Sequence, residues 1–295
     1  MTAVHADLQT VRPLAGPEPA GGIVSLELEI TGKCQLACTH CLSESSPQAS
    51  HGAMNVADWR RVITDASALG VRTVQLIGGE PTVHPQWREL AELGLSLGLH
   101  VEVYSNLFTV KPAWWDLFER DGLTLGTSYY SDDPEEHDCI TGKAGSYTRT
   151  RTNIREAVTR GIAVRVGIVD ILPGQRVKEA RAELESMGVT HINTDRVRAV
   201  GRAALPGQVP TLDEMCGRCT RGRAAILPNG DLSGCVLSRD FPAGNVRDTR
   251  LAELLGGKAW ADLAASVPPL RAKACPPADS SDCDPASTTA CDPAY

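Results

Sequence analysis

The chain has 295 residues, of which 42% are hydrophobic and 22% are charged, and these proportions are ordinary for a globular protein. Its formal net charge is −7 and no basic stripe offsets it, which argues against nucleic acid as the main partner. No run of about 18 apolar residues is present, so no membrane span is expected. The composition therefore predicts a soluble protein whose partner is neither a nucleic acid nor a membrane.

The ten cysteines are informative because the chain carries no secretion signal. Residues 1–22 are rich in Ala, Pro and Gly and lack the apolar core of a signal peptide. Cysteines in a reducing compartment bind metals more often than they form disulfides. We therefore expect a cytoplasmic protein with metal sites, preceded by a flexible lead at residues 1–22 that is too short to be a domain.

From residue 23 the chain alternates between strand-like and helix-like segments. Strands are predicted at 23–30, 71–77, 100–105, 123–129, 162–169 and 189–194. Helices are predicted at 56–69, with Asn55 as N-cap, at 85–97 and 112–120, up to Arg160, and at 177–187, with a loop and helical turn at 131–145. Six strand–helix units predict a parallel sheet with right-handed crossovers. Six are too few for the closed eight-stranded barrel, so residues 23–205 are predicted to form an α/β fold, a partial (β/α)6 TIM-like barrel.

The pattern changes after residue 205. Residues 206–295 hold six of the ten cysteines, many Pro and Gly residues, and one helix-like stretch near 251–265. The tail around Cys275, Cys283 and Cys291 has almost no apolar side chains and can become ordered only through metal ligation. We therefore expect a small Cys-rich C-terminal domain.

Three cysteines, Cys34, Cys38 and Cys41, follow the first predicted strand at the spacing C-x3-C-x2-C. Three thiolates on one short loop can hold three corners of a [4Fe–4S] cluster and leave the fourth iron open for chemistry. The alternative is a zinc site, which needs a fourth ligand that this loop does not supply.

Glycine and polar residues follow the other predicted strands, at the edge where parallel barrels place their active sites. They are Gly78-Gly79-Glu80-Pro81, Ser105-Asn106, Ser128, Gly167-Ile168 and Arg196-Val197. Taken singly, each is also compatible with a plain turn or strand end.

The cysteine motif together with Gly78-Gly79-Glu80-Pro81 resembles the radical S-adenosylmethionine (SAM) superfamily. The resemblance implies that a reduced [4Fe–4S] cluster binds SAM, cleaves it, and yields a 5′-deoxyadenosyl radical that removes hydrogen from a C–H bond. It assigns contacts with SAM to His40, to Gly78, Gly79, Glu80 and Pro81 at the methionine, to Ser105 and Asn106 at ribose or carboxylate, to the hydroxyl of Ser128, and to Gly167, Ile168, Arg196 and Val197 at the adenine.

A second constellation, Cys216-x2-Cys219-x10-Gly230-x4-Cys235, is similar to the opening of the SPASM or twitch auxiliary-cluster domain. Gly201-Arg202-Ala203 is also typical of proteins with that domain. The downstream cysteine run of a full SPASM domain is absent, and Cys275, Cys283 and Cys291 stand in its place. The resemblance implies one auxiliary [4Fe–4S] cluster held by Cys216, Cys219, Cys235 and a tail cysteine, with a second cluster or a zinc ribbon as the alternatives.

Three residues are candidates for catalysis on the substrate. Cys139 lies after the fourth predicted strand and is a small buried residue, a hydrogen donor to a substrate radical, or a contact in the substrate pocket. Asp132 and Asp170 fall near the barrel mouth, where each is a possible base or a solvated surface carboxylate.

Radical SAM enzymes with SPASM or twitch domains mostly modify ribosomally made peptides or oxidise small molecules. The resemblance therefore predicts a peptide maturase that forms a C–C or thioether crosslink. Expected partners are a precursor peptide, an electron donor such as flavodoxin or ferredoxin, and a separate leader-peptide-binding protein. A peptide epimerase using Cys139, a small-molecule dehydrogenase and a cluster-based redox sensor remain as alternatives.

Overall fold

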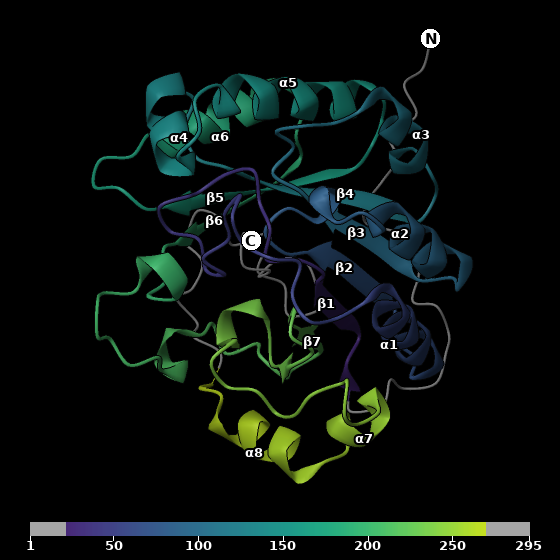
Figure 1. Ribbon diagram of the computed structural model, residues 1–295. Helices are drawn as coiled ribbons and strands as arrows, with labels where there is room; N and C mark the ends of the chain where they lie inside the picture. The colour runs from purple at the N-terminus through teal and green to yellow at the C-terminus, as the bar shows by residue number, and fades with distance from the viewer. Residues whose placement is uncertain (1–21, 270–295) are drawn as a thin grey trace.

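A computed structural model describes residues 22–269 and is built around one mostly parallel sheet (Figure 1). The first six strands are β1 Ser25–Glu29, β2 Thr73–Ile77, β3 His100–Tyr104, β4 Leu123–Tyr129, β5 Val164–Asp170 and β6 His191–Arg196. Neighbouring strands in this series all pair in parallel. The predicted six-unit partial barrel is confirmed.

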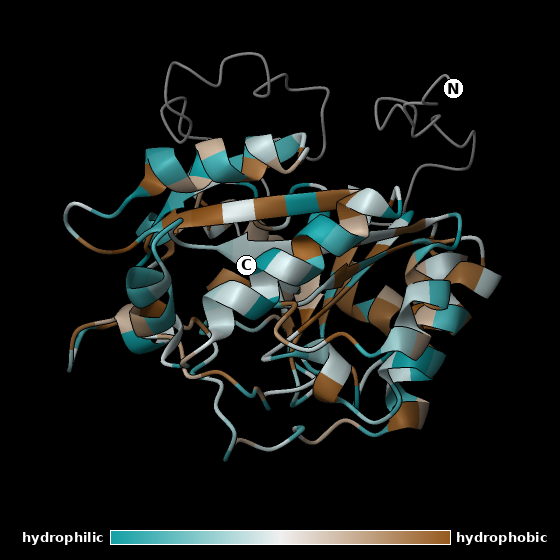
Figure 2. Ribbon diagram, turned by 90° about the horizontal axis from the view of Figure 1, so that it is seen from above, coloured by the Kyte–Doolittle hydropathy of each residue, from teal (hydrophilic) through white to brown (hydrophobic). Residues whose placement is uncertain are grey.

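Helices cover the outer face of the sheet. They are α1 Val56–Ala68, α2 Trp87–Ser96, α3 Trp115–Phe118, α4 Pro134–Thr141, α5 Ser146–Thr159 and α6 Val177–Ser186. Figure 2 shows hydrophobic residues along the strands that these helices cover, and their burial between sheet and helices stabilises the fold. The predicted cap of α1 is confirmed, since Asn55 accepts a hydrogen bond from the Asp58 backbone N–H at 3.0 Å. No helix within residues 22–269 is long and apolar enough to span a bilayer.

Several predicted helices have different bounds in the structure. Pro85 lies in a turn, and α2 begins two residues later than predicted. The segment 131–145 holds the full helix α4, and 112–120 divides into a 3₁₀ turn at Pro112–Trp114 and the single turn of α3. The stretch near 251–265 is two helices, α7 Leu251–Leu255 and α8 Lys258–Ser266, separated by a pair of glycines that favour chain breaks.

The sheet continues past the six predicted strands. β7 Arg223–Ile226 pairs in parallel with β1, and β8 Leu232–Ser233 pairs with β7 as an antiparallel hairpin. Across the described residues the strand order is β6-β5-β4-β3-β2-β1-β7-β8. The Cys-rich region after residue 205 therefore contributes strands to the same sheet as the barrel.

Two ion pairs with buried glutamates on β1 hold this Cys-rich region against that strand. Arg223 contacts Glu27 at 3.3 Å, and Arg239 contacts Glu29 at 3.0 Å. Glu27 also accepts the backbone N–H of Val236 at 2.8 Å. Removing one partner of such a pair would leave a buried charge uncompensated, so the pairs hold the two regions in one arrangement.

Candidate active site

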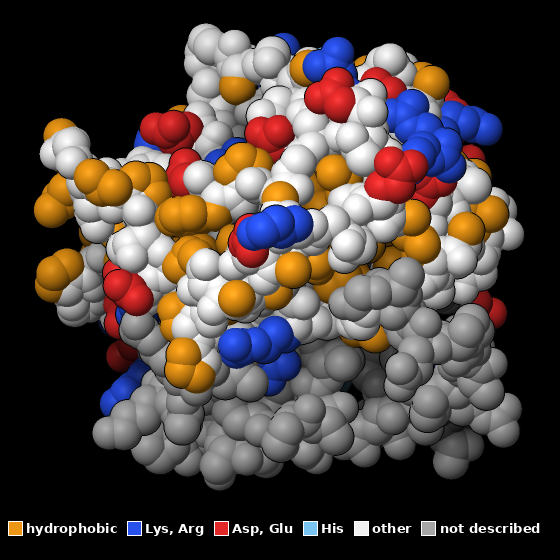
Figure 3. Space-filling model, turned by 90° about the horizontal axis from the view of Figure 1, so that it is seen from below, with side chains coloured by type: hydrophobic (Ala, Val, Ile, Leu, Met, Phe, Trp, Pro, Cys, Tyr) orange, Lys and Arg blue, Asp and Glu red, His pale blue; other side chains and the backbone are white. Residues whose placement is uncertain are grey.

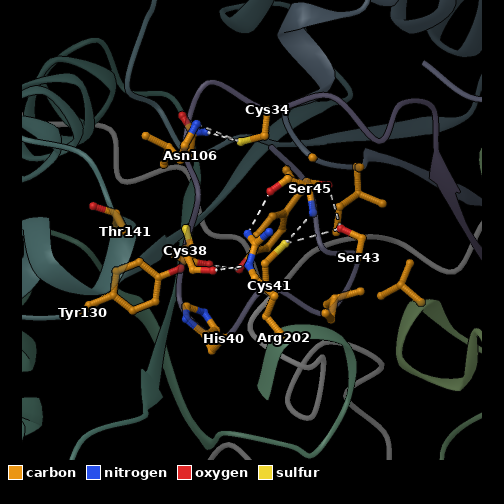
Figure 4. A pocket seen from close by; sticks show the side chains of 18 of the residues that line it. Cys34, Cys38, His40, Cys41, Ser43, Ser45, Asn106, Tyr130, Thr141 and Arg202 are labelled. Atoms are coloured by element: carbon orange, nitrogen blue, oxygen red, sulfur yellow. Dashed lines mark hydrogen bonds between the residues drawn. The ribbon is translucent and has the colours of Figure 1, made fainter. Parts of the chain in front are cut away.

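The loop that follows β1 brings Cys34, Cys38 and Cys41 to one pocket at the carboxyl ends of the strands. The pocket encloses about 790 Å³ of empty space, part of it open to solvent. Figure 4 shows the three sulfur atoms arranged around this space. The first predicted set of ligands therefore lies together, as the spacing indicated.

Hydrogen-bond donors point at these sulfur atoms. The backbone N–H of Leu36 and the side-chain amide of Asn106 donate to Cys34 Sγ at 3.4 and 3.6 Å. Tyr130 hydrogen-bonds to the sulfur of Cys38. Burial raises the pKa of the Cys34 thiol and raises that of Cys38 to about 12, which favours the neutral thiols. Iron would reverse that preference, because a coordinating thiol is deprotonated by the metal.

The donor set fits a cluster better than a single ion. Among residues 22–269, no three His, Cys, Asp or Glu side chains are placed to hold one metal ion together. The three thiols instead border a common space, and sulfur ligands with N–H donors are the usual surroundings of an iron–sulfur cluster. The arrangement thus supports Cys34, Cys38 and Cys41 as ligands of a [4Fe–4S] cluster.

Gly78 and Gly79 line the pocket, and the backbone around them leaves no room for a side chain. A Cβ atom at Gly78, whose φ is +152°, would lie 2.4 Å from the carbonyl oxygen of Thr31. A Cβ atom at Gly79 would lie 2.5 Å from the carbonyl oxygen of Lys33. Glycine is required here because the end of β2 packs directly on the start of the cysteine loop.

Glu80 has a different position from its neighbours. Its side chain is fully buried and accepts hydrogen bonds from Ser105 Oγ, the Asn106 backbone N–H and Thr82 Oγ1 at 2.8, 2.8 and 2.6 Å. Burial raises the pKa of this carboxyl group, and the hydrogen bonds oppose that rise. In the structure Glu80 joins the end of β2 to the end of β3 instead of lining the pocket.

The predicted cofactor contacts divide into two groups. His40, Gly78, Gly79, Asn106 and Ser128 line the pocket. Glu80, Pro81, Ser105, Gly167, Ile168, Arg196 and Val197 lie outside its lining. The role of each residue toward SAM stays a prediction.

His40 is buried beside Tyr130, with the ring centroids 5.1 Å apart. Burial and the nearby guanidinium of Arg202 lower the pKa of His40 to about 4. The imidazole is therefore neutral near pH 7, and the wall of the pocket next to the cysteine loop carries no histidine charge.

Arg202 is a pocket residue whose function the sequence did not reveal. Its guanidinium donates to the carbonyl oxygens of Cys38 and Ser45, each at 2.8 Å (Figure 4). The preceding Gly201 has φ +57°, and a Cβ there would lie 2.4 Å from the carbonyl oxygen of Cys41. The sequence feature that could have indicated this role is the Gly-Arg-Ala motif. In the structure its Gly201 and Arg202 contact the cysteine loop and hold it in place.

The second set of cysteines also comes together. Cys219 and Cys235 are buried with their sulfur atoms 3.1 Å apart, and Cys216 lies half-buried beside them. The hydrogen bond between the two buried thiols lowers the pKa of Cys219 and raises that of Cys235, as expected for groups that share one proton. Val236, next in the chain, lines the pocket of the first cysteine set. The predicted tail ligands Cys275, Cys283 and Cys291 lie outside the described residues.

The structure does not bring the three catalytic candidates into the pocket. Cys139 is exposed on α4, so the interpretation as a small buried residue is wrong. Asp132 binds Arg176 at 2.7 Å, which lowers the pKa of that carboxyl group, and Asp170 is exposed at the end of β5. Among the described residues, the carboxylate that lines the pocket is that of Glu29. The sequence predicted Glu29 only as part of the first strand.

The family models agree with this geometry. The model of the radical SAM superfamily matches residues 28–187, more than half of the chain, and the SPASM iron–sulfur cluster-binding domain matches residues 207–284. The chain therefore belongs to the radical SAM superfamily and carries a SPASM-type region, so its cofactors are SAM and iron–sulfur clusters.

Similar proteins narrow the class further. The PqqA peptide cyclase of Ruegeria pomeroyi is 28% identical over 214 residues, covering 70% of this chain and 51% of the relative. The subtilosin biosynthesis protein AlbA of Bacillus subtilis is 30% identical over 142 residues, covering 48% of this chain and 32% of the relative. The chain thus spans about half the length, or less, of these curated relatives. SuiB of Streptococcus suis, solved with S-adenosylmethionine, shares the fold with a TM-score of 0.68 at 16% identity, over 82% of this chain and 67% of SuiB.

Proposed function

We propose that this chain generates a 5′-deoxyadenosyl radical and uses it to form a C–C or thioether crosslink in a ribosomally made precursor peptide. The observation that carries the proposal is one pocket bordered by both cysteine regions. Cys34, Cys38 and Cys41 line one side of it, and Val236, adjacent to Cys235, lines another. A substrate held there is close to the site where the radical starts and to the site that can take up the surplus electron.

The residues of the pocket suit this chemistry. Bound to Cys34, Cys38 and Cys41, a [4Fe–4S] cluster together with SAM would supply the radical that removes hydrogen from a C–H bond. Ile77, Leu42 and Tyr104 give the pocket an apolar wall, which excludes water from reactive species. Crosslink formation also releases a proton, and we assign its acceptance to the carboxylate of Glu29.

The peptide substrate is supported by the relatives. The names of two of them give a peptide cyclase and a bacteriocin biosynthesis protein. SuiB has been solved bound to its precursor peptide, SuiA. We extend the substrate class to this chain and, with it, a cytoplasmic location, an external one-electron donor and a separate protein that binds the leader peptide.

The epimerase alternative gains no support from the position of its hydrogen donor. Cys139 is exposed on α4 and does not line the pocket in which a substrate radical would arise. A thiol that quenches the radical has to reach the reacting carbon, so the pocket geometry favours crosslinking.

The test is an anaerobic reaction of the reconstituted enzyme with SAM, a reductant and a short peptide encoded beside it. We expect 5′-deoxyadenosine together with a peptide that has lost two hydrogen atoms and whose fragmentation stops at a new crosslink. Cys235→Ala should still cleave SAM but lose the crosslink, whereas Cys38→Ala should lose both. A product of unchanged mass with an inverted stereocentre would support the epimerase, and absence of 5′-deoxyadenosine from the wild-type enzyme would refute the proposal.

A further inference from the structure

The outer side of the cysteine loop reaches the molecular surface beside the end of α4. Ala37 and Thr39 are exposed, and their backbone N–H groups donate to the carbonyl oxygens of Thr141 and Ile140 at 3.1 and 2.9 Å. Gly142, with φ +64°, lies so close that a Cβ atom there would be 2.8 Å from the carbonyl oxygen of Ala37. In Figure 1 the purple loop after β1 passes directly beneath α4. Backbone hydrogen bonds therefore connect the end of α4, next to the exposed turn that follows it, with the loop that carries the thiols.

A group of cationic and aromatic side chains lies at this turn. Lys143 and Arg149 are both exposed and both lie over the ring of Phe108, at 5.8 and 4.8 Å from its centroid. We call these three residues the Phe108 patch. Asn106 connects the patch to the thiols, because the Phe108 backbone N–H donates to Asn106 Oδ1 at 2.9 Å and Asn106 Nδ2 donates to Cys34 Sγ at 3.6 Å.

No carboxylate among the described residues neutralises the positive charge of the patch. Within residues 22–269, neither Lys143 nor Arg149 forms an ion pair with a carboxylate. The nearest acidic group along the chain, Asp138, is turned inward and accepts hydrogen bonds from Ser146 Oγ and the Tyr147 backbone N–H, both at 2.8 Å. On a chain with a formal charge of −7, this is a local positive surface beside the cysteine loop.

Cationic side chains also occur on other surfaces of the molecule. Figure 3 shows a face on which several Lys and Arg side chains lie next to Asp and Glu side chains, while one Lys/Arg group below the centre has no acidic side chain beside it. Arg151 on α5 is paired with Glu183, and Arg160, which follows the helix, is paired with Glu119, whereas the exposed Arg155 forms no ion pair with a described carboxylate. The Phe108 patch differs because its two unpaired cations share one aromatic ring and lie beside the turn that is hydrogen-bonded to the cysteine loop.

We propose that the Phe108 patch is the docking surface of a small acidic one-electron carrier protein of the flavodoxin or ferredoxin class. The reaction has to begin with transfer of one electron: the carrier is oxidised by one electron and the cluster held by Cys34, Cys38 and Cys41 is reduced by one, with no bond or proton moved. Complementary charge brings such partners together at high rates and fixes their orientation. The aromatic ring supplies an apolar contact at the centre of the cationic pair.

The carrier fits this surface better than the substrate does. An electron has only to reach the cluster, and the patch lies on the outer side of the cysteine loop. A substrate has to enter the pocket, whose lining includes none of the three residues of the patch. A surface hollow of about 510 Å³ at the patch can receive a protruding side chain of the carrier. It is lined by Phe108, Thr109, Val110, Thr148, Arg149, Thr152 and Asn153.

The test uses the reconstituted holoenzyme and the double substitution Lys143→Glu and Arg149→Glu. Two measurements are made with a bacterial flavodoxin as probe: its Kd at two ionic strengths, and the rate of 5′-deoxyadenosine formation with reduced flavodoxin or with dithionite. Reversal of two contact charges should weaken binding about 10- to 100-fold at low salt and flatten its salt dependence. The flavodoxin-driven rate should fall by a similar factor, and the dithionite-driven rate should not change. This readout needs no peptide, so it is independent of the proposed peptide substrate.

The matched control is Arg72→Glu. Arg72 is exposed and immediately precedes β2, at the amino-terminal ends of the parallel strands, whereas the cysteine loop lies at their carboxyl ends. If the double variant binds flavodoxin as tightly as Arg72→Glu does, the proposal is wrong. It is equally overturned if the dithionite-driven rate falls in parallel, because the substitutions would then act on the cluster. A raised KM for the precursor peptide with unchanged flavodoxin binding would assign the patch to the substrate and overturn the proposal as well.

Discussion

Replacement of Arg202 by lysine tests whether the Gly201-Arg202 pair braces the cysteine loop. The guanidinium bridges two carbonyl oxygens on separate parts of the loop, those of Cys38 and Ser45, each at 2.8 Å. Lysine keeps the charge but has a single nitrogen on a flexible stem, so it cannot reproduce the planar fork. We expect Arg202→Lys to retain one of the two hydrogen bonds at most.

The magnitude follows from the bond that is lost. A hydrogen bond from a charged donor contributes about 1.5–3 kcal/mol to the free energy of unfolding. Because Arg202 is half-buried, we expect a loss of free energy of unfolding in the lower part of this range, about 2 kcal/mol, for Arg202→Lys. Arg202→Met removes both hydrogen bonds and should cost roughly twice as much. In a chain of this size, about 2 kcal/mol lowers the melting temperature by roughly 4–8 °C.

Two measurements check this expectation: the melting temperature of the reconstituted enzyme, and the rate at which a chelator removes iron from it. We expect Arg202→Lys to lose iron from the first cluster faster, because the loop that carries Cys38 is less constrained. Arg196→Lys is the control, since Arg196 forms an exposed ion pair with Glu214 whose loss costs about 0.5 kcal/mol or less. Equal melting temperatures and equal iron loss in the two variants would show that Arg202 is no brace.

Three further predictions follow from the same geometry. Gly201→Ala should lower the melting temperature and the iron content, because the added Cβ would lie 2.3 Å from the carbonyl oxygen of Leu42. Gly145→Ala is the control: Gly145 also has a positive φ but has open space around it, so this variant should keep its full iron content. Arg239→Met should destabilise the chain by about 3 kcal/mol by leaving Glu29 buried and unpaired, and adding Glu29→Gln should restore part of that loss in denaturant titrations. Burial lowers the pKa of His137 to about 4, below its unfolded value of 6.5, so its contribution to stability is present above pH 6.5 and is lost as the pH falls toward 4. His137→Gln should therefore show a smaller drop in urea midpoint between pH 7 and pH 5 than the wild-type chain.

The parts of the site that could be predicted from the sequence are the local ones. The spacing of Cys34, Cys38 and Cys41 fixes three thiols on one loop whatever surrounds it, and the family model and the pocket agree with that interpretation. Gly78 and Gly79 were predicted as cofactor contacts, and the structure adds that they let β2 pack on the cysteine loop. Local spacing and backbone requirements carry this information because they do not depend on distant partners.

The parts that could not be predicted depend on pairing between distant segments. β7, with the sequence Arg-Ala-Ala-Ile, has neither alternation nor strong strand propensity, and it becomes a strand by pairing with β1 about 200 residues earlier. Glu29 reads as one position of a strand, and only its partner Arg239 and the pocket around it give it a function. Cys139 was misjudged because the face that α4 turns to solvent is set by its packing on α5 and the cysteine loop.

Strand β1 links the two cysteine regions. Its carboxyl end leads into the loop of Cys34, Glu29 lines the pocket next to that loop, and Glu27 accepts the N–H of Val236 beside Cys235. One strand thus joins the two cysteine regions, to which the proposed function assigns radical formation and uptake of the surplus electron. Because Glu27 and Glu29 are both buried and each is paired with an arginine, a shift of either region would leave a buried carboxylate unpaired, at a cost of about 3–5 kcal/mol. A substrate radical formed in the pocket would therefore meet an electron acceptor at a fixed distance, which is what an oxidative crosslink requires and a hydrogen shuttle does not.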